Sequence, residues 1–268
     1  MKPTTAIVII HYGQIETTRA SLKKLAGKID SYPLIMVNNT SQDLTSLKKI
    51  IPQIHFIQNR RNLGFAKGVN LGIDYALKNL NPDSILLLNN DLSFSYGTIS
   101  RLRKTLFYES GAGLVAPVLH HSKELYDWGG KYNRWWGSVK HQNFKQKPKR
   151  LIQVDHLAGA ALLIKKEVFD QIGFFDERFF LYFEDLDFCL RAKRAGYRLF
   201  IDPEVVAEHQ VSASSKPLNR ILYQWQSHLK FVFKYLPFQA YPTALLYDLI
   251  FYPLAILKIL LKKLITHE

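Results

Sequence analysis

An acidic residue directly follows a run that the sequence predicts to be a buried strand. The apolar residues 85–88 lead into Asn89, Asn90 and Asp91. Parallel α/β sheets place their ligands at the carboxyl ends of strands, so the Asp91 carboxylate is a candidate ligand for a hard divalent cation. The two asparagines would offer amide groups beside it. An Asn/Asp-rich turn that only closes the strand is the alternative.

A second group of acidic residues follows a dense aromatic run. Residues 174–183 lead into Glu184, Asp185 and Asp187 at the start of a predicted helix. We expect the aromatic neighbours to desolvate Asp185 partly, which favours its protonated form and makes it a stronger base when ionised. Helix capping is the alternative for Asp185, and Asp187 is expected to pair with Arg191 one turn later.

A lone histidine, His209, follows the last predicted strand. Such a histidine is ordinarily unremarkable, but with Asp91 it could complete a metal site of one carboxylate and one imidazole. This hypothesis requires the fold to bring distant segments together. We expect Asp91, Asp185 and His209 to line one common cleft.

Two glycines, Gly64 and Gly68, lie between Asn62 and Asn70 at the start of another predicted helix. Glycines there let a ligand or a backbone approach closely, and the first helical N–H groups are available to an anion. A glycine-containing helix cap is the alternative. The spacing matches neither G-x-G-x-x-G nor G-x-x-x-x-G-K-[ST], which argues against a conventional dinucleotide fold and a Walker-type NTPase.

Strands and helices alternate through the first part of the chain. Strands are predicted at 6–10, 34–37, 55–57 and 84–88, and helices at 14–25, 43–50 and about 65–80. The alternation predicts a doubly wound, mostly parallel sheet. Polar clusters at 11–13, 38–41 and 89–91 follow three of these strands, so we expect them to converge at one edge of the sheet.

The pattern changes in the second half. We expect a helix at 95–108, strands at 113–118, 199–202 and 205–207, a strand ending at 164 and a helix at 166–172. Residues 126–137 concentrate aromatic residues and glycines, which form either a platform for sugar rings or the core of a small β-meander. Small residues around Gly159 indicate a tightly packed floor beneath a pocket.

The composition is that of a globular protein with an anionic partner. The chain has 268 residues, of which 47% are hydrophobic and 22% charged, and this excludes a disordered polypeptide. Its formal charge of +14 implies nucleotide phosphates, nucleic acid or an acidic membrane surface. The single Cys189 rules out an internal disulfide, and the N-terminus carries no secretory pattern, so we expect a cytoplasmic location.

The C-terminal segment from residue 217 has a different character. Residues 244–261 are strongly apolar but include Asp248, Pro253 and Lys258, which makes this segment a poor transmembrane candidate. At 100° per residue the polar positions fall within an arc of about 140°, which predicts an interfacial helix with lysines facing anionic lipid. Helices that pack on the catalytic domain or across a dimer are the alternative.

Together these motifs resemble glycosyltransferase family 2, particularly its rhamnosyltransferase-like branch. The resemblance covers residues 4–215 through the run 62–70, the Asn89-Asn90-Asp91 block, the segment 156–160 and the acidic pattern of 175–187. It implies a GT-A fold of the α/β class. The nucleotide-sugar half would span 1–118 and the acceptor and catalytic half 119–215, followed by a helical membrane-associating extension at 216–268.

The resemblance also implies roles for individual residues. Asp91 and His209 would hold Mg²⁺ or Mn²⁺, and Asp185 would be the catalytic base, with Glu184 beside it. The nucleotide sugar would be bound by His11, Tyr12, Asn38, Asn39, Ser41, Asn62, Gly64, Phe65, Gly68, Asn70, Asn89 and Asn90. The acceptor and sugar pocket would contain Trp128, Gly129, His156, Gly159 and Ala160.

Two positions depart from the family pattern. Asn89 stands where many members have the first aspartate of the DXD motif, so this site carries less negative charge. Asn38 stands where many members have an aspartate that contacts the base, which weakens any inference about uracil versus thymine.

The resemblance implies an inverting, metal-dependent transferase. It would move a sugar, with dTDP-rhamnose favoured over UDP-linked donors, to a hydroxyl of a lipid-linked glycan during surface-polysaccharide synthesis. The enzyme would be peripheral on an anionic membrane at the inner face of the plasma membrane, with a homodimer as one arrangement.

Two other functions are the alternatives. A basic nucleic-acid-binding module would use the charge but leave the Asn/Asp clusters unexplained, and we expect no nucleic-acid partner. A nucleotidyltransferase would need a Gly-rich basic loop after the first strand, which residues 11–14 do not supply.

Overall fold

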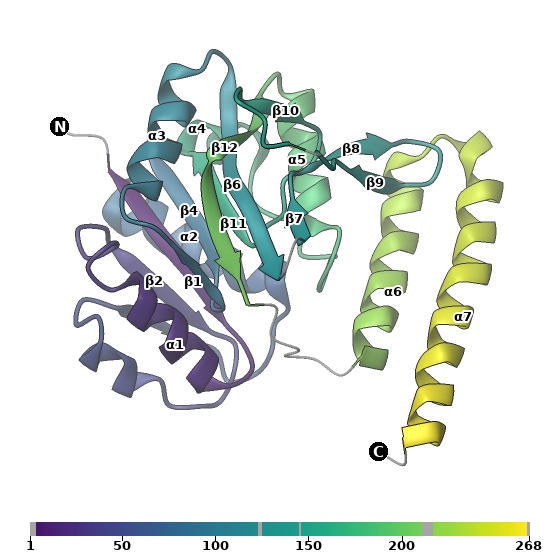
Figure 1. Ribbon diagram of the computed structural model, residues 1–268, viewed down its shortest axis with the longest axis horizontal. Coiled ribbons are helices and arrows are strands. Elements are labelled where there is room, and N and C mark those ends of the chain that lie inside the picture. Colours follow the sequence, from purple (N-terminus) through teal and green to yellow (C-terminus); the bar gives the residue numbers. More distant parts are fainter. Residues whose placement is uncertain (1–3, 123–124, 145, 211–216, 267–268) are drawn as a thin grey trace.

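Figure 1 shows the protein as a computed structural model that describes residues 4–122, 125–144, 146–210 and 217–266. The first part of the chain contains β1 (Thr5–His11), α1 (Ile15–Leu25), β2 (Leu34–Asn38), the 3-10 helix η1 (Thr45–Lys49), β3 (His55–Gln58), α2 (Phe65–Leu80) and β4 (Ser84–Asn89). The alternation of strands and helices predicted for this part of the chain is confirmed. The segment 43–50 forms only a short 3-10 helix, since Pro52 follows closely and cannot continue an α-helix.

The second part adds strands on the other side of β4. Its elements are β5 (Leu92–Phe94), α3 (Thr98–Tyr108), β6 (Ala112–Ser122), β7 (Leu125–Asp127), β8 (Gly130–Asn133), β9 (Ser138–His141), β10 (Ile152–Val154), β11 (Ala161–Lys165), α4 (Lys166–Ile172), α5 (Glu184–Arg194) and β12 (Arg198–His209). The two strands predicted at 199–202 and 205–207 are one strand, β12, with a register shift between Asp202 and Val206. The buried Asp202 carboxylate accepts hydrogen bonds from Arg101 and Thr105 of α3, which fixes this irregularity.

Ten strands form one mixed sheet in the order β10-β12-β6-β11-β4-β1-β2-β3, with β5 paired to β12 and β7 paired to β6, while β8 and β9 form a separate two-stranded sheet. β3, β2, β1 and β4 are mutually parallel, as are β6 and β12, while β11 runs antiparallel between β4 and β6. The mostly parallel α/β sheet predicted from the sequence is therefore confirmed.

Helices cover both faces of the sheet (Figure 1). One apolar core joins the sheet to α2, α4 and α5, and the other joins it to α1, η1 and α3. Alternate residues of β1 point to opposite cores: Val8 belongs to the first and Ile9 to the second. This explains why the strand is hydrophobic throughout, because both of its faces are covered.

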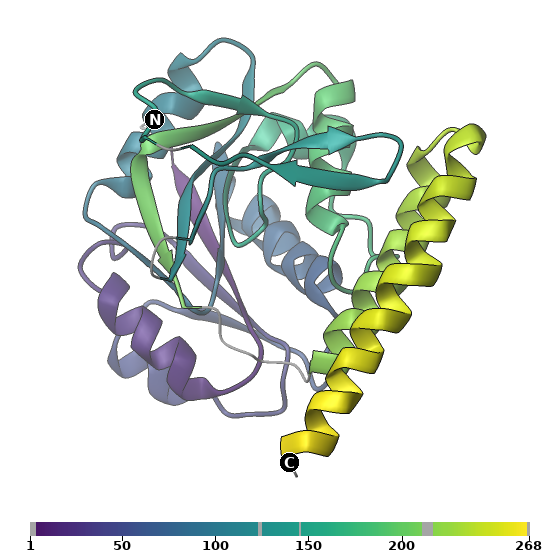
Figure 2. The same ribbon diagram turned by 45° about the vertical axis from the view of Figure 1, so that its right-hand side comes forward.

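Two helices follow the sheet and lie side by side beyond its edge (Figures 1 and 2). They are α6 (Pro217–Tyr235) and α7 (Tyr241–Thr266), joined by the 3-10 helix η2 (Phe238–Ala240). A third apolar cluster holds α6 to α5 through residues such as Phe179, Leu186 and Phe231. The C-terminal helices thus pack on the rest of the protein.

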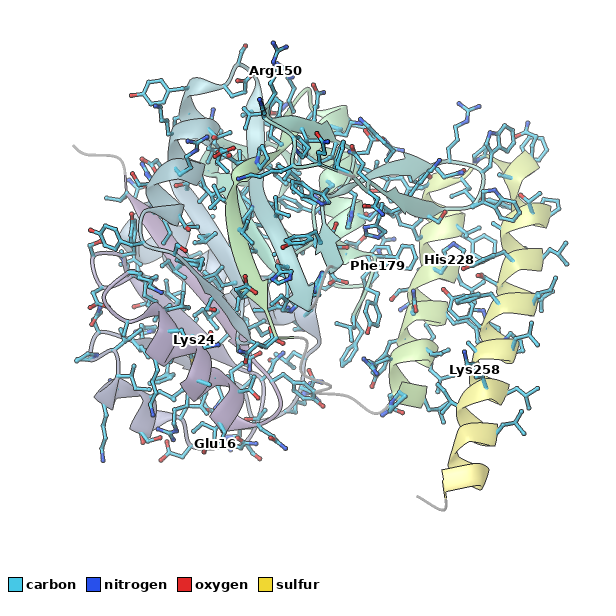
Figure 3. The ribbon with its side chains drawn as sticks, in the orientation of Figure 1. Glu16, Lys24, Arg150, Phe179, His228 and Lys258 are labelled. Atoms are coloured by element: carbon cyan, nitrogen blue, oxygen red, sulfur yellow. The ribbon has the colours of Figure 1, made fainter. Side chains whose placement is uncertain are left out.

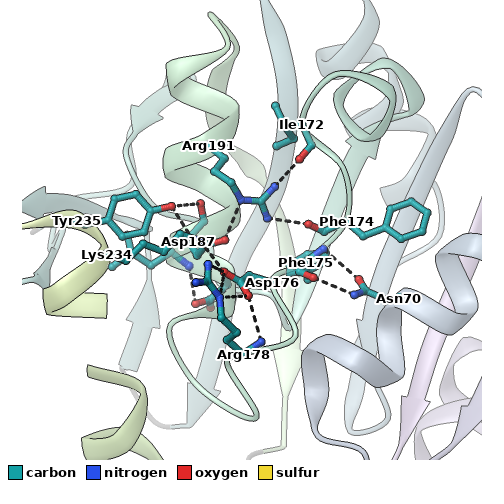
Figure 4. A network of polar contacts seen from close by, with 12 residues as sticks. Asn70, Ile172, Phe174, Phe175, Asp176, Arg178, Asp187, Arg191, Lys234 and Tyr235 are labelled. Carbon is teal, nitrogen blue, oxygen red and sulfur yellow. Dashed lines mark hydrogen bonds and ion pairs between the residues drawn. The ribbon is translucent and has the colours of Figure 1, made fainter. Parts of the chain in front are cut away.

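A buried carboxylate also ties α6 to α5 (Figure 4). Asp187 accepts hydrogen bonds from Arg191 at 2.9 Å, which confirms the pair predicted from the sequence, and from Tyr235 at 2.7 Å. Lys234 pairs with Asp187 and with Asp176. Arg191 of α5 and Lys234 and Tyr235 of α6 supply positive charge and hydrogen-bond donors to the fully buried Asp187 carboxylate. This carboxylate therefore holds α6 against α5.

Asp248 and Tyr252, which the sequence places on the polar face of an interfacial helix, instead face α6. Asp248 and Tyr252 are each only 2% exposed, and Oδ1 of Asp248 lies 2.5 Å from Nδ1 of the buried His228 on α6. Figure 3 shows His228 on α6 beside α7, and Lys258 further along α7. A buried carboxylate needs such a partner. Asp248 therefore joins α7 to α6, whereas Lys258 is exposed.

The remaining surface of α7 is apolar and exposed. Its exposed large side chains include Leu246, Leu249, Ile250, Leu254 and Leu257. The segment Phe238–Leu261 has 24 residues and contains an 18-residue window with a mean hydropathy of 1.9, so it is long and apolar enough to cross a membrane by length and composition. The expectation of a poor transmembrane candidate does not hold by these two criteria.

Candidate functional site

The polar ends of β1, β2 and β4 meet at one edge of the sheet, as predicted. His11 pairs in register with Asn38, and Ile10 pairs with Asn89. The convergence follows directly from the parallel arrangement of the three strands.

A cavity of about 270 Å³ opens at this edge. It is lined by Ile10, Tyr12, Asn39, Asn62, Gly64, Phe65, Asn89, Asn90, Asp91, Phe180, Leu181, Tyr182, His209 and Arg220. We call this cavity the donor cavity, after the nucleotide-sugar donor that the sequence resemblance predicts for these residues. Most of the residues assigned to the nucleotide sugar from the sequence, together with both proposed metal ligands, are therefore brought to one place.

One loop of the donor cavity is built around Gly64. Asn62 accepts a hydrogen bond from the Gly64 N–H at 2.9 Å, and Asn39 donates to the Gly64 carbonyl at 2.9 Å. Gly64 has a φ of +83°, and a Cβ placed on it would lie 2.4 Å from the Phe180 carbonyl oxygen. The glycine is therefore required for a close backbone contact, which the Phe65 N–H completes by donating to that oxygen at 2.8 Å.

Other residues predicted to bind the nucleotide sugar lie outside the lining of the donor cavity. Asn38 is occupied within its own turn, where it donates to Gln42 and Gln58. Ser41 is exposed on the same loop. Asn70 exchanges hydrogen bonds with the Phe175 backbone at 2.9 and 3.0 Å and thus connects α2 to the segment before α5 (Figure 4).

His11 and Gly68 support the cavity from behind. His11 is fully buried and bonds through Nδ1 to the Thr18 hydroxyl at 2.7 Å, which in turn accepts a bond from Asn90. Burial lowers the pKa of His11 to about 4, so the ring is neutral at physiological pH. A Cβ on Gly68 would collide with Ile10 and Asn39, so this glycine allows α2 to pack closely on β1 and β2.

Asp91 and His209 lie next to each other, although they come from opposite parts of the chain. Oδ1 of Asp91 is 3.1 Å from Nε2 of His209, and both side chains are largely buried. β5 pairs with the end of β12, and this pairing positions the two residues. The His121 ring packs behind His209, with 5.0 Å between the ring centroids.

The Asp91 and His209 pair fits a hard divalent cation. Two atoms that occupy adjacent positions of an octahedral site with bonds of about 2.1 Å lie about 3 Å apart, as these two do. Within the described ranges no cluster of three or more His, Cys, Asp or Glu side chains could hold a metal. A cation here would therefore take further ligands from diphosphate oxygens and water, as Mg²⁺ commonly does.

Asp185 lies at the start of α5, beside a second cavity of about 350 Å³. Its Oδ2 is 3.3 Å from His156 Nε2 and accepts the Gly159 N–H at 3.2 Å, and its Oδ1 accepts the Leu186 N–H at 2.8 Å. Burial alone would raise the pKa of Asp185, but His156 and the two N–H groups outweigh burial and lower this pKa. Desolvation acts in the predicted direction, but the expectation that it would favour the protonated form of Asp185 overall is wrong, because these donors stabilise the carboxylate.

Glu184 behaves in the opposite way. Burial, followed by repulsion from the Asp185 carboxylate, raises the pKa of Glu184 well above its ordinary value. Its Oε2 is buried and has no hydrogen-bond partner among the described residues. Of the two adjacent acids, Glu184 therefore holds a proton more strongly, and the negative charge is favoured on Asp185.

The second cavity, here called the acceptor cavity, lies between α5, the β8–β9 hairpin and the C-terminal helices. Its lining consists of Ser138, Val139, His141, His156, Tyr182, Phe183, Glu184, Asp185, Leu186, Gln224, His228, Tyr247 and Tyr252. Tyr182 also lines the donor cavity. The expected single cleft is thus two cavities that meet at Tyr182, with Asp91 and His209 on one side and Asp185 on the other.

The backbone between the two cavities has an unusual conformation. Tyr182 and Phe183 both have a φ of +67°, in the left-handed region that residues with side chains rarely occupy. The turn ends immediately before Glu184, the first residue of α5. Such conformations persist only where the surroundings enforce them, and they are concentrated at functional sites. The turn therefore supports a functional site at the start of α5.

The residues assigned to the acceptor pocket from the sequence are distributed differently. His156 lines the acceptor cavity, and Gly159 supports Asp185 through its N–H. Trp128 and Gly129 are buried in the fold and border neither cavity, while the Ala160 carbonyl accepts the Asn89 N–H at 2.8 Å. Of the three tryptophans of the aromatic segment, Trp128 is buried in the apolar core, which favours a structural role for it, whereas Trp135 and Trp136 are exposed.

Several lining residues were not identified from the sequence. Arg220, Gln224 and His228 come from α6, and Tyr247 and Tyr252 from α7. Their spacing is ordinary for a helix, and no local motif marks them. The separation of four residues between Arg220, Gln224 and His228 was the available signal, since it places them on one face of α6.

Two protein-family models match the chain. Residues 6–173 match the family model described as glycosyl transferase family 2, and residues 118–265 match one described as glycosyl transferase family group 2. The low-salt glycan biosynthesis hexosyltransferase of Haloferax volcanii is 29% identical over 199 residues, covering 72% of this chain and 63% of its own length.

Two rhamnosyltransferases are similar at lower identity. WbbL of Escherichia coli K12 is 25% identical over 246 residues, covering 86% of this chain and 91% of WbbL. The N-acetylglucosaminyl-diphospho-decaprenol L-rhamnosyltransferase of Mycobacterium tuberculosis is 23% identical, with 68% of each chain covered. These similarities confirm the resemblance to the rhamnosyltransferase-like branch.

Among solved structures, the mannosyltransferase PcManGT from Pyrobaculum calidifontis in complex with GDP-Man and Mn²⁺ superposes with a TM-score of 0.63 at 14% identity. The match covers 96% of this chain and 72% of that one. It confirms the GT-A fold. The first family match alone spans well over half of the sequence, and the chain belongs to glycosyl transferase family 2.

Proposed function

We propose that the protein is an inverting glycosyltransferase that moves a sugar from a nucleoside diphosphate to a hydroxyl of a lipid-linked glycan, with dTDP-rhamnose as the favoured donor. One observation carries this proposal: the two cavities meet at Tyr182, with the pair formed by Asp91 and His209 in one and the ionised Asp185 in the other. Two separate binding sites that share a wall suit transfer between two substrates.

Asp185 is the general base in this proposal. Its carboxylate takes the proton of the acceptor hydroxyl as the hydroxyl oxygen forms a bond to the anomeric carbon. The bond from that carbon to the diphosphate breaks, and its electron pair leaves with the nucleoside diphosphate. A single displacement inverts the anomeric centre and forms no covalent enzyme intermediate.

The residues around Asp185 keep it ready for this role. His156 and the Gly159 N–H fix Oδ2, and together they stabilise the charged form at physiological pH. Burial raises the pKa of Glu184, which favours its protonated form and so disfavours a second negative charge beside the base. Asp91 and His209 would hold Mg²⁺ or Mn²⁺, which would supply positive charge to the departing diphosphate.

The similar proteins and α7 support the acceptor and the location that we propose. The Mycobacterium tuberculosis relative is named for a decaprenol-linked diphosphate sugar, and a lipid-linked acceptor here would resemble it. The exposed apolar face of α7 suits a membrane surface, and the exposed Lys258 suits anionic lipid. We propose that the enzyme acts in surface-polysaccharide synthesis at the cytoplasmic face of the plasma membrane, with a homodimer through α7 as an alternative use of that face.

The proposed function is tested by incubating the purified protein with dTDP-rhamnose or UDP-sugars, Mn²⁺ and a polyprenyl-diphosphate sugar. Release of nucleoside diphosphate with formation of an inverted product is expected. Asp185→Asn should lower kcat at least about 100-fold, the usual contribution of a general base. Asp74→Asn, which removes an exposed carboxylate of α2, is the matched control. Full activity of Asp185→Asn would refute the assignment of the base.

A further inference from the structure

One row of side chains on α6 reaches both cavities. Arg220, Gln224 and His228 are spaced by four residues and so lie along one face of the helix. Arg220 lines the donor cavity, whereas Gln224 and His228 line the acceptor cavity. We infer that α6 is part of the active site: Arg220 binds the diphosphate of the donor, and Gln224 binds the acceptor sugar. The inference builds on the proposed function.

Arg220 has the chemistry that a diphosphate requires. It is the one lysine or arginine among the described residues that line the donor cavity. The Arg220 guanidinium makes no hydrogen bond or ion pair with the described residues, so its donors are available to a ligand. Its positive charge acts on Tyr182 of the same cavity. A planar guanidinium can contact two phosphate oxygens at once, and its charge would offset the carboxylate of Asp91 in the same cavity.

The position of Arg220 is defined by contacts along the whole helix. The Ser227 hydroxyl donates to the Leu181 carbonyl at 2.8 Å, next to the left-handed turn that separates the cavities. The rings of Tyr223 and Phe180 lie 4.8 Å apart between centroids. Because Phe180, Leu181 and Tyr182 also line the donor cavity, α6 packs directly on its wall.

Gln224 is the side chain of this row that suits an acceptor sugar. The neighbouring His228 uses Nδ1 for Asp248 at 2.5 Å and Nε2 for the Trp136 carbonyl at 2.9 Å. Both nitrogens of His228 are therefore committed to holding α6, α7 and the β8–β9 hairpin together. Gln224 is exposed at the cavity and offers both a donor and an acceptor, as sugar hydroxyls require.

The first test measures binding without turnover. Isothermal titration calorimetry with dTDP and with UDP, each with Mn²⁺, is carried out on the full-length protein and on Arg220→Ala. A rise in Kd of at least about tenfold is expected, with partial recovery in Arg220→Lys, which keeps the charge but loses the planar fork. Lys230→Ala removes an exposed cation from the same helix and should leave Kd within twofold.

The second test addresses the acceptor. Gln224→Ala should raise KM for a polyprenyl-diphosphate sugar at least about fivefold while the Kd for dTDP stays within twofold. Gln226→Ala removes the same side chain from an exposed position two residues away, on another side of α6, and should change neither constant.

The outcomes separate the inference from the proposed function. Wild-type protein that binds neither nucleotide would overturn both. Wild-type binding and transfer, with an unchanged Kd in Arg220→Ala or an unchanged acceptor KM in Gln224→Ala, would overturn the inference and leave the proposed function intact. Thermal unfolding of each variant distinguishes loss of binding from loss of fold.

Discussion

Nε2 of His156 lies 3.3 Å from Oδ2 of Asp185, and this contact decides the charge of the proposed base. The surroundings of Asp185 are buried, which would raise its pKa, yet its net pKa is lowered because His156 and backbone N–H groups favour the carboxylate. A base that must be ionised loses activity as the pH falls through its pKa. His156 therefore extends the pH range in which the proposed base is ionised toward acidic pH.

Replacing His156 with Ala should move the acidic limb of the pH profile to higher pH. Without the imidazole, burial dominates and the pKa of Asp185 rises, so activity at neutral pH falls while activity at alkaline pH is partly retained. The measurement is kcat/KM against pH. His55→Asn alters an exposed histidine elsewhere and serves as the control. An unshifted acidic limb would show that His156 does not set the charge of the base.

Replacing Glu184 with Gln should stabilise the protein at high pH. The raised pKa means that the folded state retains a proton that the unfolded state releases above its ordinary pKa of 4.5. Stability from the protonated group is present below that value and is lost as the pH rises toward the folded pKa. Thermal unfolding should show a Tm gain of at least about 2 °C at pH 8, the shift that ~1 kcal/mol produces in a protein of this size, and none at pH 4. A gain that does not change with pH would contradict this explanation.

Changing Asp91 to Asn or His209 to Ala should weaken binding of the metal. Removal of one of two protein ligands should raise the Mn²⁺ concentration required for half-maximal activity at least about tenfold. Electron paramagnetic resonance of Mn²⁺ titrated with protein and dTDP gives a readout that is independent of turnover. Equal Mn²⁺ affinity in the variants and in the Asp74→Asn control would exclude this pair as the metal site.

Changing Gly64 to Ala should destabilise the protein more than the same change at Gly173. Both glycines combine a positive φ with an extended ψ (83° and 175° at Gly64, 72° and −165° at Gly173), but a Cβ on Gly173 has no atom within 4 Å, whereas on Gly64 it would meet the Phe180 carbonyl. Gly173→Ala therefore reports backbone strain alone, about 1–3 kcal/mol. Urea unfolding should show a clearly larger loss for Gly64→Ala, together with weaker binding of dTDP. Equal losses would mean that the close contact is unimportant.

The apolar face of α7 should bind membranes. Leu249→Asp together with Leu257→Asp should reduce co-sedimentation with anionic vesicles at least about fivefold, since charges replace side chains that would enter the lipid. Tyr108→Asp, an exposed site on α3, is the control. Vesicle binding that survives the double change would refute this role, and a lipid-free dimer that it dissociates would identify a second subunit as the occupant.

Local sequence patterns were sufficient to predict much of the fold. The apolar runs of β1, β2 and β4 fix the strands, and their parallel order brings the polar ends together without further information. The pair formed by Asp187 and Arg191 follows from helical spacing alone. These features depend on residues that are close in the sequence or on a general property of parallel sheets.

Features that depend on distant contacts were missed or misassigned. Asn70 lies in a suggestive motif, but its amide bonds to Phe175, which is 105 residues away. The charge of Asp185 depends on His156, which reaches it from another part of the chain. No pattern within the C-terminal segment indicates that Arg220 reaches the donor cavity or that Asp248 turns inward toward His228. Tertiary packing determines each of these contacts, because the two partners come from different elements of the fold.

Asp187 has a practical consequence for anyone who wishes to produce a shortened, more soluble version of this protein. Truncation after residue 215 would remove Lys234 and Tyr235, and Arg191 alone would remain beside a carboxylate that the intact chain shields completely from water. The cut would also expose Phe179 and Leu186, which α6 covers. Helix α6 therefore also stabilises the helix that carries the proposed base, and detergent is a better means than deletion of keeping the exposed apolar face of α7 in solution.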